Sequence, residues 1–264
     1  MRQDRPPGHP AAAPPGGRAV TASGPEPGHE RRPEPGPAAE EPRPAPAPVP
    51  RRDTAALLTV AGACAALFAA TAVTVSVRHG APLAAEQAGV RWSIAHRGEP
   101  VHSMAGALTA TGSGAVPYLM AVLAGLLAGR RARGRLRAVC CAVVVLAVGQ
   151  AIRYGLMELL ARPRPPVADW TGSASGYAFP SGHATTSALA AGILAWGIAR
   201  RARPAVARTW CVVLALWAAG VGLTRVYLGV HWPGDVLGGW FLAAGLLALA
   251  LLLEPFALRR PDRA

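Results

Sequence analysis

Six long apolar runs, separated by short polar connections, make up most of the chain after residue 53. The runs lie near 55–77, 104–129, 138–161, 181–199, 209–228 and 235–256. Each is close to the ~20 residues that a helix needs to cross the hydrocarbon core of a bilayer. Ser, Thr and Gly dilute the fourth and fifth runs more than the others. The pattern predicts an all-α protein built as a bundle of six transmembrane helices.

The segments outside these runs have a different composition. Residues 1–50 hold 15 of the 26 prolines and cannot bury enough apolar surface to offset the entropy lost on ordering. We therefore expect a disordered, cytoplasmic N-terminal tail over 1–53, a membrane domain over 54–258 and a short cytoplasmic tail over 259–264. The segment at 82–97 is too polar to span a membrane, which favours a short interfacial helix.

Composition supports a membrane protein and argues against other classes. Charged residues make up 16% of the chain, whereas a soluble domain carries about 25%. The four cysteines fall inside apolar runs without a CxxC pair, so neither a disulfide framework nor a zinc cluster is indicated. The net charge of +13 comes from arginine alone, and its surplus lies beside the apolar runs. This distribution favours a topology signal over a nucleic-acid surface.

Arginine clusters flank alternate runs and so indicate the orientation of the chain. The clusters are Arg51 and Arg52; Arg130, Arg131, Arg133, Arg135 and Arg137; Arg200, Arg201, Arg203 and Arg208; and Arg259, Arg260 and Arg263. The connections at 78–103, 162–180 and 229–234 are poorer in arginine. Because positive charge is retained inside, we expect a multi-pass protein of the cell membrane with both termini in the cytoplasm. The arginine-poor connections then face outward.

A set of polar residues lies at the outward ends of the predicted spans, where such residues are costly. They are Arg162 and Arg164 in ARPRPP, Ser181, Gly182 and His183 in PSGH, Arg225 in LTRVYLGV, and His231 and Asp235 in HWPGD. The connections that carry them follow the third and fifth spans, so they share one membrane face by parity. We therefore expect them to converge on one extracytoplasmic site.

These residue types suit phosphoryl transfer without a metal or another cofactor. Arginine is a rigid, bidentate donor to phosphate oxygens and stabilises the charge of a transferring phosphoryl group. A helix that opens at Ser181 and Gly182 adds backbone N–H donors and a favourable dipole. One histidine can attack phosphorus while the other protonates the leaving oxygen. Asp235, four residues after His231, is placed to accept the second ring proton.

The segments ARPRPP, PSGH at 180–183 and TRVYLGVHWPGD at 224–235 stand in this order along the chain. They resemble the three motifs of the type 2 phosphatidic acid phosphatase superfamily, in its bacterial membrane-bound form; vanadium haloperoxidases and glucose-6-phosphatase belong to the same superfamily. The resemblance covers about residues 55–256. It implies a membrane phosphatase that hydrolyses a lipid phosphate or diphosphate through a phosphohistidine. Phosphatidic acid, phosphatidylglycerol phosphate and an isoprenyl diphosphate are all compatible substrates.

The resemblance also implies a role for each matching residue. His231 is the expected nucleophile, Asp235 its orienting partner, and His183 the acid that protonates the leaving oxygen and then the base that activates water. The expected phosphate ligands are Arg164, Arg225, Ser181, Gly182 and Arg162. Among these Arg162 ranks last, because Glu158 lies four residues earlier and could pair with it.

One position departs from the family pattern. The family carries a lysine seven residues before the arginine of its first motif, and Met157 stands there. Arg153 lies one helical turn earlier on the same face, so we hypothesise that it reaches the site instead. The missing lysine supports an alternative, a catalytically weak membrane protein that binds lipid phosphates. Vanadate-dependent halide oxidation and a zinc site rank lower, because the known haloperoxidases are soluble and converging arginines would repel a dication.

Overall fold

The computed structural model describes residues 54–258, and all regular structure in this range is helical. The elements are α1 (Thr54–Val77), α2 (Ala84–Ala95), α3 (Val101–Ala110), α4 (Ala115–Ala128), α5 (Ala132–Leu160), the 3₁₀ turn η1 (Val167–Asp169), α6 (Gly182–Ala199), α7 (Pro204–Tyr227) and α8 (Pro233–Ala257). The all-α prediction is confirmed for this part of the chain. The tails predicted over 1–53 and 259–264 lie outside the described residues.

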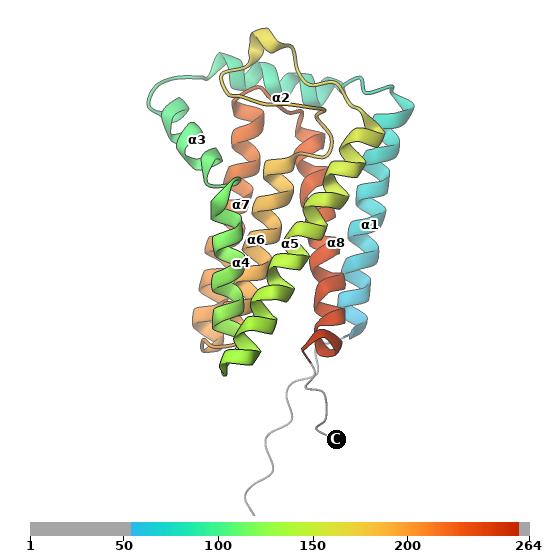
Figure 1. The fold of residues 1–264 in the computed structure, drawn as a ribbon. Helices are drawn as coiled ribbons and strands as arrows, with labels where there is room; N and C mark the ends of the chain where they lie inside the picture. Colours follow the sequence, from blue (N-terminus) through green and yellow to red (C-terminus); the bar gives the residue numbers. More distant parts are fainter. Residues whose placement is uncertain (1–53, 259–264) are drawn as a thin grey trace, which may run out of the picture. The chain divides into compact units, whose positions relative to one another are not determined.

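The long helices pack side by side and alternate in direction (Figure 1). The helix α6 lies among α4, α5, α7 and α8, while α1 packs mainly against α8. The largest apolar core fills the space between the central helices and includes Leu146, Leu189 and Leu214. On α1, by contrast, large apolar side chains such as Leu67 and Val73 are exposed. Such an exposed apolar surface suits contact with lipid chains.

Four helices, α1, α5, α7 and α8, are long and apolar enough to cross a membrane. The predicted run at 104–129 is broken: α3 and α4 are bent by 53° and count together as one further candidate. The helix α6 does not qualify, because residues such as Thr185 and Ser187 lower its hydropathy. These side chains are buried, since α6 faces other helices, where small residues allow close packing. The chain thus has four or five candidate spans, and the count of six stays a prediction.

The connections that carry the motif residues lie together at one end of the helical bundle. Figure 1 shows the connection from α5 to α6 crossing this end beside α2, while the turns from α4 to α5 and from α6 to α7 lie at the other end. The arginine-rich segments 130–137 and 200–208 therefore lie opposite the motif residues. The short helix predicted within 82–97 is present as α2; its interfacial position stays a prediction.

Candidate active site

A cavity of about 460 Å³ lies at this end of the bundle, among α5, α6 and α7. Five of its lining residues are ionisable, and they are Arg153, Arg164, His183, Arg225 and His231. None of the lining residues found in the described part of the chain is acidic. A cavity lined by three guanidinium groups and two imidazoles suits an anion with several oxygens, such as a phosphate group.

The backbone after α7 turns sharply and places His231 over the end of that helix. The amides of Val230 and His231 both donate to the carbonyl of Arg225, at 3.1 and 3.3 Å. The turn requires Gly229, which has a φ of +73°, in the left-handed region. A Cβ at this position would lie 2.3 Å from the carbonyl oxygen of Asp169. The glycine in GVHWPGD therefore determines where the histidine stands.

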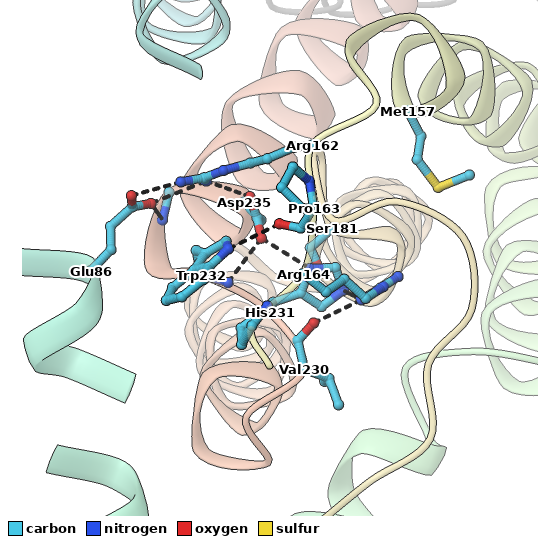
Figure 2. Close-up of polar contacts among 12 residues, drawn as sticks. Glu86, Met157, Arg162, Pro163, Arg164, Ser181, Val230, His231, Trp232 and Asp235 are labelled. Atoms are coloured by element: carbon cyan, nitrogen blue, oxygen red, sulfur yellow. Dashed lines mark hydrogen bonds and ion pairs between the residues drawn. The ribbon is translucent and has the colours of Figure 1, made fainter. Parts of the chain in front are cut away.

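The hydrogen bonds of His231 define which ring nitrogen carries the proton (Figure 2). Nη1 of Arg164 lies 2.9 Å from Nε2 of His231, and a guanidinium can only donate, so Nε2 is the unprotonated nitrogen. Nδ1 then donates to Oδ2 of Asp235 at 3.3 Å. Burial lowers the pKa of His231 to about 4, although the Asp235 charge opposes the shift. The imidazole is thus neutral at pH 7, and the electron pair of Nε2 accepts the hydrogen bond from Arg164.

Arg164 is held by backbone carbonyls of two connections, the one from α5 to α6 and the one from α7 to α8. Its Nε donates to the carbonyl of Gly176 at 2.9 Å, and its Nη2 to that of Ser175 at 2.8 Å. Nη1 donates to the carbonyl of Val230, also at 2.8 Å. Burial lowers the pKa of Arg164, but a guanidinium remains protonated in proteins. These contacts fix a cation directly beside His231.

The remaining motif residues take different positions. Arg225 lines the cavity, and its Nη1 and Nη2 donate to Thr109 Oγ1 at 2.9 Å and to the carbonyl of Ser173 at 3.1 Å. His183 and Gly182, the first two residues of α6, also line the cavity. The hydroxyl of Ser181 is fully buried outside that lining set. Its amide donates to the carbonyl of Asp235 at 2.9 Å, which joins the start of α6 to α8.

Arg162, predicted as the last of the phosphate ligands, does not reach the cavity. Its side chain is only 2% exposed, and Nη1 donates to Oδ1 of Asp235 at 2.6 Å. Nη1 and Nη2 also donate to the two carboxylate oxygens of Glu86, at 3.1 and 2.7 Å. Burial alone would lower the pKa of Arg162, but these carboxylates raise it above its usual value. Glu86 on α2, not Glu158, is therefore the partner, and Arg162 lies on the far side of Asp235 from His231.

Sequence reasoning missed Glu86, although one signal was available. Glu86 is the one acidic residue of the segment 82–97, and the structure buries it to 6% exposure. A charge in such a place needs a partner. The sequence did not show which arginine it meets.

Arg153 lines the cavity and lies one helical turn before Met157 on α5. Its Nη1 lies 3.1 Å from the sulfur of Met157, and its Nε is buried without a hydrogen-bond partner among the described residues. A Cβ at Gly182 would lie 3.4 Å from Cζ of Arg153, so the guanidinium packs against the start of α6. Figure 2 shows Met157 to one side of the polar network around His231.

Comparison with known proteins relates this site to a family. The sequence model of the PAP2 superfamily matches residues 138–259. The undecaprenyl-diphosphatase of Sulfolobus acidocaldarius is 28% identical over 123 residues, or 42% of this chain and 51% of that protein. Phosphatidylglycerophosphatase B of Bacillus subtilis is 32% identical over 113 residues, or 42% of this chain and 54% of that protein. Its namesake in Escherichia coli is 39% identical over 83 residues, or 30% of either chain.

The fold is also similar to a solved structure. The crystal structure of a transmembrane PAP2-type phosphatidylglycerolphosphate phosphatase from Bacillus subtilis has a TM-score of 0.64 and 22% identity, covering 77% of this chain and 98% of that one. The resemblance indicated by the three motifs is confirmed, because residues 138–259, which contain all three, match the sequence model of the PAP2 superfamily. The chain spans about half or less of the length of the three curated relatives.

Proposed function

We propose that this chain is an integral membrane phosphatase that hydrolyses a lipid phosphate or diphosphate through a phosphohistidine on His231. The observation that carries the proposal is the bonding of His231, with Nδ1 toward Asp235 and the electron pair of Nε2 toward a fixed cation in the cavity. This is the protonation state that a histidine nucleophile requires. The relatives named as phosphatases support the same reaction class.

The proposed reaction has two displacements at phosphorus. Nε2 of His231 attacks, the N–P bond forms, and the bond to the leaving oxygen breaks as His183 donates a proton to that oxygen. His183 then takes a proton from water, whose oxygen attacks phosphorus and breaks the N–P bond. Arg164 and Arg225 bind the phosphoryl oxygens, which carry the charge of the transition state. In the first step, Nη1 of Arg164 ends its hydrogen bond to Nε2 of His231 and donates to one of these oxygens instead.

Arg153 is proposed to supply the cationic contact that Met157 does not provide. The guanidinium lines the cavity and packs against the start of α6, whose N–H groups and dipole also favour an anion. On this proposal the Arg153 guanidinium binds a phosphoryl oxygen together with the Gly182 backbone. Loss of Arg153 should then lower activity more than reversion of Met157 to lysine raises it.

Orientation and span number complete the proposal. The chain crosses the cell membrane six times, with α3 and α4 as one broken span and α6 as an internal span. Both termini are cytoplasmic and the active site is extracytoplasmic, because the arginine-rich turns lie opposite the cavity. A cysteine-free variant carrying Val167→Cys, at an exposed position of the outer connection, should react with an impermeant maleimide in intact cells. The matched variant Arg131→Cys should react only after lysis, and the reverse pattern would overturn the orientation.

The substrate is proposed to be a lipid that presents its phosphate at the bundle end without leaving the bilayer. Phosphatidic acid, phosphatidylglycerol phosphate and an isoprenyl diphosphate share the required group, and the relatives' names favour the last two. Phosphate release from each lipid by the purified protein, with chelator present, tests the function beside His231→Ala. Chelator-resistant release that disappears in the variant supports it. A folded wild type that binds these lipids but releases no phosphate would instead indicate the lipid-phosphate-binding protein.

A further inference from the structure

The ion-pair network behind His231 contains a residue from outside the three motifs. Glu86 lies on α2 and is 76 residues from Arg162 in sequence. Its Oε2 accepts Nη2 of Arg162 at 2.7 Å, and its Oε1 accepts Nη1 at 3.1 Å. Figure 2 shows the order in space: Glu86, then Arg162, then Asp235, then His231.

The two carboxylates share one buried guanidinium. Glu86, Arg162 and Asp235 are 6%, 2% and 0% exposed, respectively. Asp235 divides its oxygens, with Oδ1 on Arg162 at 2.6 Å and Oδ2 on Nδ1 of His231 at 3.3 Å. Because solvent screening is weak at such burial, the sum of these charges acts on the imidazole.

The net charge of this network determines how well the positive charge that forms on His231 during attack is stabilised. Two carboxylates and one guanidinium leave a net charge of −1 beside Nδ1. Attack by Nε2 on phosphorus makes the imidazole cationic, and a net negative charge stabilises it. Without Glu86, the charges of Arg162 and Asp235 would cancel, and the forming cation would face a neutral pair.

We propose that Glu86 is a positioning residue for catalysis, which neutralises Arg162 so that the carboxylate charge of Asp235 remains available to His231. The inference rests on the proposed phosphatase function. It extends the site to α2, because Glu86 also accepts the amides of Leu83 at 2.7 Å and Gly234 at 3.0 Å. These bonds fasten the first turns of α2 and α8 to the same carboxylate.

The test compares Glu86→Gln with Glu99→Gln. Glutamine keeps the size of the side chain and one acceptor oxygen for the amides, but removes the charge. Glu99 is a matched control on the same end of the bundle, where it bonds only to His102 and Ser103 among the described residues. With phosphatidic acid in mixed micelles, Glu86→Gln should lower kcat at least tenfold while KM changes less than threefold. Glu99→Gln should match the wild type.

A single-turnover measurement separates positioning from simple loss of folded protein. Phosphatidic acid labelled with ³²P is mixed with excess enzyme, and the phosphoenzyme is trapped in alkaline detergent. Glu86→Gln should lower the rate constant of phosphoenzyme formation at least tenfold with most of the amplitude kept. A reduced amplitude at an unchanged rate constant would show that Glu86 only supports folding and would overturn the inference.

A double variant tests the role of charge directly. Glu86→Gln combined with Arg162→Met restores a net charge of −1 next to His231 and fills the volume of the guanidinium stem. The double variant should form the phosphoenzyme at least threefold faster than Glu86→Gln alone. An equal or slower rate would refute the role of charge. Wild-type protein that releases no phosphate from phosphatidic acid, phosphatidylglycerol phosphate or an isoprenyl diphosphate would reject the function itself, which distinguishes the two failures.

Discussion

Replacing Asp235 by asparagine tests the arrangement around the nucleophile most directly. In the structure, Oδ1 of Asp235 accepts Nη1 of Arg162 at 2.6 Å, and Oδ2 accepts the amide of Trp232 at 2.8 Å and Nδ1 of His231 at 3.3 Å. Asparagine has one acceptor oxygen, and the charged, shorter contact to Arg162 should retain it. The amide group then points its N–H at Nδ1.

In Asp235→Asn, the imidazole of His231 should therefore adopt the tautomer that cannot attack. An amide N–H facing Nδ1 favours the imidazole with its proton on Nε2, the atom that must attack and that faces the donor Arg164. By analogy with histidine–aspartate pairs elsewhere, kcat should fall about 10³- to 10⁴-fold, or about 4–5.5 kcal/mol of transition-state stabilisation. The loss of stability should be smaller, about 1–3 kcal/mol, because Arg162 keeps Glu86 as a charged partner.

The assay is phosphate release from phosphatidic acid in detergent, with thermal unfolding of the same preparation as the check on folding. Asp169→Asn is the matched control, since Asp169 lies on the same bundle end and contributes its backbone carbonyl to Arg97. It should keep wild-type kcat. A folded Asp235→Asn protein with kcat within tenfold of the wild type would refute the reasoning.

Three further results are expected. Arg153→Ala should lower kcat/KM about 10- to 100-fold through the loss of a charged contact to phosphate, whereas full activity would exclude Arg153 from the site; kinetics on phosphatidic acid measure this. Burial lowers the pKa of His231 to about 4, so falling pH should protonate the nucleophile only near that value. The acid limb of kcat/KM assigned to His231 should therefore lie well below pH 6.5, and a limb at the ordinary histidine pKa would contradict the burial. Gly229→Ala should lower the melting temperature and kcat together, because its φ of +73° and the approach of the Asp169 carbonyl leave no room for a Cβ; an unchanged melting temperature would be inconsistent with this turn.

Much of the fold could be predicted from the sequence because a helix that spans a membrane consists of one long, continuous run of apolar residues. The runs at 55–77, 138–161, 209–228 and 235–256 correspond to α1, α5, α7 and α8. The hydropathy pattern was less informative for helices that pack against other helices. The run at 104–129 is apolar throughout, yet the TGSG segment breaks it into α3 and α4. The helix α6 packs against four other helices, and its buried Ser and Thr residues lower its hydropathy. Hydropathy alone therefore does not reveal its central position in the bundle.

The candidate site shows the same division. Motif spacing predicted that His231, His183, Arg164 and Arg225 would meet, and all of them line one cavity. Spacing could not separate Arg162 from Arg164, although they are two residues apart. The backbone at Pro163 directs one guanidinium toward Asp235 and Glu86 and the other toward His231.

By itself the sequence determined the helical class, the long apolar runs, the shared bundle end of the motif connections and the resemblance of residues 138–259 to the PAP2 superfamily. Each of these depends on composition or spacing within one segment. Only the tertiary structure decided that Glu86 meets Arg162, that Arg153 enters the cavity beside Met157, and that Nε2 of His231 is the unprotonated nitrogen. These depend on contacts between helices far apart in the chain, and such contacts are set by how side chains pack in three dimensions, which no local pattern encodes.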